Sequence, residues 1–144
     1  MMESREEAVA VVRQTIWQTL HPRVAELARS RFESGHYADA VEAVLKEINS
    51  GIKSIVLDKT GEELDGAKLM NRAFSVNSPI FKLGDLDSAS GKNIQQGYMQ
   101  IFAGTMTGIR NPKAHDNIVI SEIEGLHHLY LASLLMHKID KSEY

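Results

Sequence analysis

The longest helical pattern in the sequence runs from His36 to Val56, and it limits the fold more than any other feature. Apolar residues recur every three or four positions, at Ala40, Val41, Val44, Leu45, Ile48, Ile52, Ile55 and Val56. At about 3.6 residues per turn, this spacing places the apolar side chains on one face of a helix of roughly six turns. Such a face has to pack against other elements, and no stretch of the sequence alternates as strands do. The sequence therefore predicts an all-α protein.

Further segments with helical spacing extend this prediction to a bundle. Ser4-Arg-Glu-Glu7, Thr60-Gly-Glu-Glu63 and Ser121-Glu-Ile-Glu124 have the form of a capping box, which predicts a helix start at each. His21-Pro22 is expected to open another helix, because proline is tolerated in the first turn. The prediction is an up-and-down bundle of four to five main helices plus a short helix, with a long loop at about residues 75–90.

Composition excludes several classes of protein. The 144 residues suit a single domain, residues 1–144, and the absence of cysteine excludes disulfides, thiolate metal sites and cysteine nucleophiles. No apolar run reaches the roughly 20 residues of a membrane span, so a soluble, cytoplasmic protein is expected. The formal net charge of -3 gives no general attraction to a polyanion. Contact with a nucleic acid would therefore depend on a local cluster of residues.

An arginine and a histidine stand close together where a second strong helical pattern ends. This pattern runs from Lys92 to Arg110 and is expected to stop at Asn111-Pro112, because a residue before proline is disfavoured in the helical region. Asn111 could then cap a new turn that returns His115 towards Arg110. Arginine binds phosphate well, and histidine exchanges protons near neutral pH. These are the groups needed to cleave RNA without a metal ion, with Arg110 stabilising the phosphate and His115 acting as base or acid.

A purely structural explanation of the same residues stays open. Arginine at a helix C-terminus is favoured by the helix dipole, so Arg110-Asn111-Pro112 could be only a helix stop. In an unbroken helix, Arg110 and His115 would point about 140° apart and could not share a substrate. The sequence has no His-x3-His pair, and the adjacent His127 and His128 diverge by about 100° on a helix. Neither a metal site nor a cofactor is expected.

Three glycines lie on nearly one line of the helix that precedes Arg110. Gly97, Gly104 and Gly108 are separated by seven and four residues, which places them on almost the same side at about 100° per residue. Glycine lets another backbone approach closely. That backbone could belong to a neighbouring helix of the same chain or to a second copy of the chain, and the sequence leaves both open.

Several segments, in matching order, resemble known protein families. Arg110-Asn-Pro-Lys-Ala-His115 is similar to the Arg-x4-His motif of the HEPN superfamily (higher eukaryotes and prokaryotes nucleotide-binding domain). Together with Leu69-Met-Asn-Arg-Ala-Phe74 and the glycine-bounded run from Gly97 to Gly104, residues 108–115 resemble the Ymh-type family of conserved hypothetical bacterial proteins. The resemblance covers roughly Leu20 to Leu135.

The resemblance implies a helical homodimer whose two Arg-x4-His motifs face a shared cleft and act as a metal-independent endoribonuclease. By the match, Arg110 and His115 would be catalytic and Asn111 supporting. Independently of the match, the positive charge of Lys113 is expected to bind substrate phosphate. HEPN proteins occur in toxin-antitoxin, abortive-infection and other phage-defence systems, so the implied partners are RNA, a second copy, and an antitoxin or other defence protein. Other members are non-catalytic RNA-binding or protein-interaction modules, which is the alternative interpretation.

Overall fold

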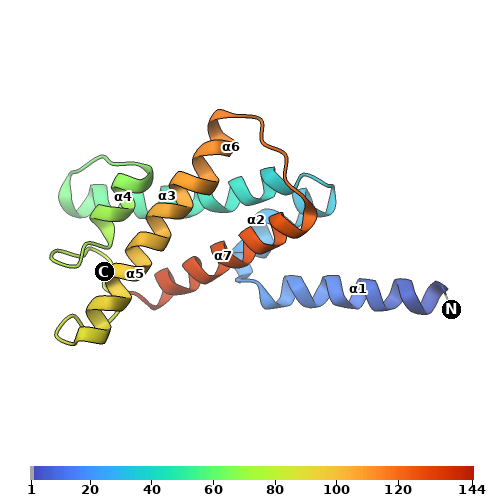
Figure 1. Ribbon diagram of the computed structural model, residues 1–144, viewed down its shortest axis with the longest axis horizontal. Helices are drawn as coiled ribbons and strands as arrows, with labels where there is room; N and C mark the ends of the chain where they lie inside the picture. The colour runs from blue at the N-terminus through green and yellow to red at the C-terminus, as the bar shows by residue number, and fades with distance from the viewer. Residues whose placement is uncertain (1) are drawn as a thin grey trace.

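The computed structural model describes residues 2–144, and these form an all-α helical bundle (Figure 1), as the sequence predicts. Within residues 2–144 there is no strand, only an isolated bridge between Lys82 and Glu143. No described helix has both the length and the apolar character required to span a membrane. The helices are α1 (Met2–Thr19), α2 (Pro22–Glu33), α3 (Tyr37–Thr60), α4 (Gly66–Ala73), α5 (Ala89–Thr105), α6 (Asn111–His115) and α7 (Glu122–Lys141), and a π-helical segment, η1 (Met106–Arg110), joins α5 to α6.

Helix α3 lies at the centre of the bundle and packs against α2, α4 and α7. Its buried face consists of predicted apolar positions together with one polar residue, Asn49, and Ile55 is partly buried beside it. The buried apolar side chains of the described residues form one continuous cluster. The helix ends at Gly61, whose φ of 74° lies in the left-handed region that favours glycine.

Two predicted helix starts are confirmed. His21 caps α2 through its Nδ1 atom, which accepts a hydrogen bond from the Arg23 amide at 3.0 Å, and Pro22 occupies the first turn. Ser121 caps α7 through Oγ, which accepts from the Glu124 amide at 3.1 Å. In both cases a side chain satisfies a backbone donor that the helix itself leaves without a partner.

The capping boxes predicted at Ser4 and Thr60 are wrong. Helix α1 already begins at Met2, so Ser4 lies inside it. Thr60 is instead the last residue of α3, where its hydroxyl donates to the carbonyl of Val56 at 2.7 Å. Helix α4 begins later, with Asp65 in the N-cap position. The same Ser/Thr-x-x-Glu spacing therefore marks a helix start at one place and a helix end at another.

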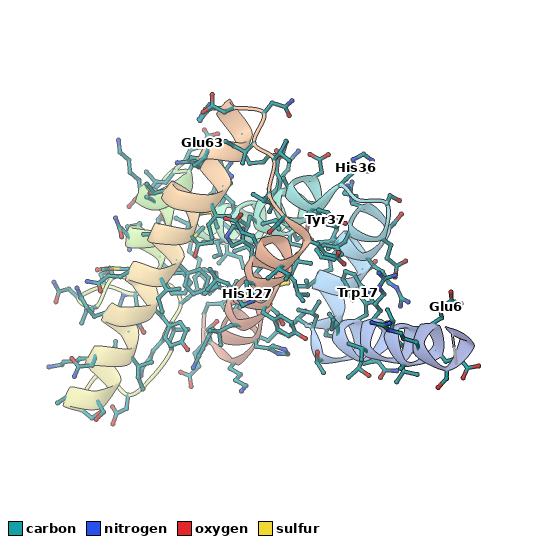
Figure 2. The ribbon with its side chains drawn as sticks, turned by 45° about the vertical axis from the view of Figure 1, so that its right-hand side comes forward. Glu6, Trp17, His36, Tyr37, Glu63 and His127 are labelled. Atoms are coloured by element: carbon teal, nitrogen blue, oxygen red, sulfur yellow. The ribbon has the colours of Figure 1, made fainter. Side chains whose placement is uncertain are left out.

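Helix α1 extends away from the bundle (Figure 1). It packs at its C-terminal end, where Trp17 and, just after the helix, Leu20 are buried, whereas Glu6 lies far out along the projecting part (Figure 2). The side chains of Val9 and Val12, which belong to its apolar stripe, are 47% and 58% exposed. The stripe of α1 therefore contributes to the core only near Thr19.

The long loop predicted at about residues 75–90 is present, as residues 74–88 lie outside helices. It is nevertheless anchored, because Gln95 of α5 is buried and bonds to three backbone groups around it. Its Nε2 donates to the carbonyls of Phe74 and Phe81, and its Oε1 accepts from the Leu83 amide. Phe81 is also buried and packs against Phe74, so the loop is held on the same core as the helices.

Candidate functional site

The helix break predicted at Asn111-Pro112 is wrong. Arg110 and Asn111 both have right-handed helical angles, and the chain leaves the helical conformation only at Asp116. Proline has no N–H, and its place in the first turn of α6 makes that loss tolerable. The Asn111 amide reaches back five residues to the carbonyl of Met106, which is the hydrogen bond of a π-helix. Helices α5 and α6 with η1 thus form one continuous rod, residues 89–115.

This continuity changes how Arg110 and His115 relate to each other. Residues 111–115 are α-helical, so no turn brings His115 back over Arg110. Five positions along a helix correspond to roughly 140° of rotation, and the two side chains leave the rod on different sides. His115 is exposed and Asn111 is half-buried. In one chain, the side chains of Arg110, Asn111 and His115 therefore lie on the same rod but do not point towards one common site.

Arg110 is held by a network that begins in the core. Its NH1 atom lies 3.3 Å from Oδ2 of Asp65, and the Arg110 side chain is 20% exposed. The other carboxylate oxygen of Asp65 accepts from Nδ2 of the buried Asn49 at 2.6 Å, and Asn49 Oδ1 accepts from the Gly66 amide. The Asn49 hydrogen bond, and then the charge of Arg110, lower the pKa of Asp65. The network therefore places a negative charge beside the guanidinium.

Lys113, the predicted phosphate contact, is bound by two carboxylates of α3. Its ammonium lies 3.0 Å from Asp39 Oδ1 and 3.6 Å from Glu42 Oε2, and the lysine side chain is only 17% exposed. The hydrogen bond between them raises the pKa of Lys113 and lowers that of Asp39. The structure thus gives Lys113 a role in fastening α6 to α3. Its contact with substrate stays a prediction.

The hollow beside α6 is too small to enclose a nucleotide. A cavity of about 100 Å³ lies where Gly108, Pro112 and Lys113 face α3 and the start of α7. Pockets that hold small organic molecules measure roughly 300–1,000 Å³. Neither Arg110 nor His115 lines this cavity.

The outer face of α5 carries a stripe of isoleucines and glycines, which we call the outer stripe. Ile94 and Ile101 are 42% and 39% exposed. A Cβ atom built at Gly97, Gly104 or Gly108 would meet no atom within 4 Å. The glycine line therefore does not serve close packing inside the described chain. The outer stripe consists of Ile94, Gly97, Ile101 and Gly104 of α5 and continues to Gly108 of η1, which also borders the hollow beside α6.

A group of metal-ligand side chains that the sequence did not predict lies at the C-terminal end of α7. His21, His137 and Asp140 each offer one ligand atom, and these three atoms lie within 4.8 Å of one another. His21 Nε2 is 2.6 Å from Asp140 Oδ2, and the two imidazole rings have centroids 4.7 Å apart. The only local signal was the spacing of three between His137 and Asp140, because His21 joins them through the tertiary fold.

By its fold, the protein is an all-α helical bundle that carries an arginine and a histidine on one partly π-helical rod. A family model described as "Protein of unknown function (Hypoth_ymh)" matches residues 18–139, and the chain belongs to that family. The match confirms the resemblance to the Ymh-type family. No curated protein and no solved structure matches the chain.

Proposed function

We propose that the chain is a metal-independent endoribonuclease of the HEPN type that acts as a homodimer. The observation that supports this most strongly is the rod of residues 89–115. It carries Arg110, Asn111 and His115 at one end, and its outer stripe has no neighbour within the described chain at any of its three glycines. Short π-helical segments inside α-helices also occur frequently at functional sites.

A dimer would supply what one chain lacks. The outer stripe has spacings of three and four residues, which suit packing against another helix, and its glycines allow that helix to come close. In a two-fold dimer each contact occurs twice, with the roles of the copies exchanged. If two rods pack in parallel along their outer stripes, their α6 helices come together. The arginine of one copy and the histidine of the other can then face one phosphate.

In this proposal, cleavage follows from proton transfer and charge stabilisation. His115 accepts the proton of the ribose 2′-hydroxyl, and the resulting oxygen attacks the adjacent phosphorus. A bond forms between the 2′-oxygen and phosphorus while the bond from phosphorus to the 5′-oxygen breaks. The second histidine of the dimer donates a proton to the leaving oxygen. The products are a 2′,3′-cyclic phosphate and a 5′-hydroxyl.

Arg110 stabilises the negative charge that builds up on the phosphate oxygens during this reaction. A guanidinium has five N–H donors, and the contact with Asp65 at 3.3 Å engages one of its terminal nitrogens. The other donors can meet phosphate while Asp65 fixes the position of the side chain. Asn111 supports the site from the next position on the rod. Membership of the HEPN superfamily would further suggest a role in toxin-antitoxin, abortive-infection or other phage-defence systems, with an antitoxin as partner.

The test is RNA cleavage in EDTA by matched variants. Purified wild type, Arg110→Ala, His115→Ala and the control His127→Ala, which removes an exposed histidine of α7, are incubated with total RNA. Wild type and the control should release fragments with cyclic-phosphate ends. Loss of a general acid-base or a charge-stabilising group should lower the rate by roughly 10²-fold or more. Intact RNA in the wild-type lane would refute the proposal, provided that thermal unfolding shows all four proteins to be folded.

A second candidate is a non-catalytic helical module that binds RNA or a protein. It is favoured by the pairing of both cations of the site, because Arg110 lies beside Asp65 and Lys113 lies beside Asp39 and Glu42. Under this alternative, RNA stays intact with every variant. A gel-shift assay then shows binding if the module recognises RNA and no binding if it recognises a protein. Cleavage by wild type that is lost in Arg110→Ala would exclude it.

A further inference from the structure

The cluster of His21, His137 and Asp140 has the composition of a zinc site. Zinc binds histidine nitrogen and carboxylate oxygen at about 2.0–2.2 Å, so two ligands of a tetrahedral ion lie roughly 3.3–3.5 Å apart. The three ligand atoms here lie within 4.8 Å of one another, with 2.6 Å between His21 Nε2 and Asp140 Oδ2. Shifts of about 1 Å would therefore give a suitable geometry. We propose that these three side chains bind one zinc ion, with water as the fourth ligand.

A contact with α7 holds the backbone of His21 in place, and the other two ligands lie on one face of α7. His21 is only 13% exposed, and its backbone amide donates to Oγ of the buried Ser133 on α7 at 2.8 Å. His137 and Asp140 are three residues apart on α7, which places them on one face of that helix. The nearby cation Arg23 is neutralised by Glu47 and Glu26. The ion would join the start of α2 to the last turns of α7.

Two hydrogen bonds of the His21 ring oppose zinc binding. Nδ1 of His21 accepts from the Arg23 amide, so in the neutral ring Nε2 carries the proton and donates to Asp140. Zinc at Nε2 replaces that proton, and the neutral ring then holds its proton on Nδ1. Both the cap on α2 and the hydrogen bond from Nε2 to Asp140 are lost, which together lower the affinity by roughly 30-fold. This factor is small beside the many orders of magnitude in affinity that zinc sites attain.

The ligand set also discriminates between metals. Imidazole nitrogens suit zinc and neighbouring transition metals, whereas magnesium prefers oxygen ligands in octahedral geometry. His21 and Asp140 also line a cavity of about 290 Å³ whose walls include Ile52, Phe81 and Met136. The proposed ion therefore lies at the rim of an apolar hollow, where its fourth position is open to water.

The test measures thermal unfolding and calorimetric binding of the full 144-residue chain without an affinity tag. Zinc at a hundredfold excess over its Kd should raise the Tm of wild type by roughly 5–10 °C, with one ion bound per chain, and magnesium should not. His137→Gln and His21→Asn should lose this shift. Asparagine is a good N-cap, so His21→Asn removes the ligand while keeping the start of α2. His127→Gln, on the same helix but outside the cluster, should respond like wild type.

A wild-type Tm that zinc leaves unchanged, equal shifts in His137→Gln and wild type, or an equal shift with magnesium would overturn the proposal. The site is separate from the proposed ribonuclease residues, so His137→Gln should cleave RNA at the wild-type rate in EDTA. The zinc titration and the RNA assay can therefore fail independently of each other.

Discussion

Helices α3 and α5 both carry apolar stripes, yet the bundle covers them to different extents. On α3, Val44, Leu45 and Ile52 are at most 1% exposed, and helices pack around that face. On α5, Phe102 is fully buried on the inner side, where it stacks on Phe74 with ring centroids 4.2 Å apart. Its neighbour Ile101 is 39% exposed on the outer side.

This difference shows that helical periodicity identifies a helix without identifying what covers it. The single apolar face of α3 packs in the core. α5 has an inner face in the core and an outer stripe that the described chain leaves exposed, and the rod that begins with α5 ends at Arg110 and His115. The exposed stripe therefore lies on the same rod as the proposed ribonuclease residues.

The largest effect should come from neighbouring residues on the two faces of α5. Phe102→Ala removes a buried aromatic ring and should lower the free energy of unfolding by roughly 3–5 kcal/mol. Ile101→Ala removes a partly exposed side chain and should lower it by less than about 1 kcal/mol at concentrations where the chain is monomeric. Urea unfolding at low protein concentration measures both. Equal losses would mean that the outer face is covered after all.

Replacing each of two glycines of α5 by alanine should change the free energy of unfolding in opposite directions. A Cβ at Gly91 would lie 1.7 Å from the carbonyl oxygen of Asp85, so Gly91→Ala requires the backbone to move and should destabilise the chain by more than about 1 kcal/mol. A Cβ at Gly104 meets open space, and Gly104→Ala should stabilise the monomer by about 0.5–1 kcal/mol.

Urea unfolding measures the stability of Gly91→Ala and Gly104→Ala, and sedimentation at rising protein concentration measures self-association. A replacement at Gly104 that is longer than alanine, such as Gly104→Gln, should weaken self-association while leaving the monomer folded, because its side chain keeps a second rod at a distance. Destabilisation by Gly104→Ala in dilute solution would contradict the open outer face.

The sequence predicted those parts of the fold that are determined by residues close to one another in the chain. The stripe of α3, the His21-Pro22 start and the Ser121 cap each depend on residues within a few turns of one another. Thr60 shows the limit of such signals, since its hydroxyl satisfies the end of α3 rather than the start of α4. The choice between these roles depends on where Asp65 and Gly66 place the next helix.

The candidate site was less predictable, because contacts between distant residues shape it. Proline rules predicted a break before Pro112, but Lys113 fastens α6 to Asp39 on α3 and Arg110 meets Asp65. These contacts hold the residues on both sides of the proline in helical conformation, and η1 accommodates the change in hydrogen bonding. His21 and Asp140 likewise meet across 119 positions, a distance that no local pattern spans.

The smallest predicted effect concerns the ion pair that connects α4 to the rod. The pKa of Asp65 is lowered in the folded chain, chiefly by the Asn49 hydrogen bond and then by Arg110. The folded state therefore binds fewer protons than the unfolded state in acid, and this stability is present above pH about 4 and is lost as pH falls through the folded pKa. Because the Asp65 side chain is 53% exposed, solvent screening limits the contribution of its charge to less than about 1 kcal/mol.

Asp65→Asn should accordingly lower the free energy of unfolding slightly at pH 7 and by progressively less as the pH falls below about 4. The control Asp58→Asn changes an exposed carboxylate of α3 and should have no such pH-dependent difference. Urea unfolding at pH 7, 5 and 3 measures the three proteins. If the difference between wild type and Asp65→Asn stays constant or grows in acid, the carboxylate charge is not what joins Asp65 to Arg110, and the anchoring of the rod would have to depend on Lys113 instead.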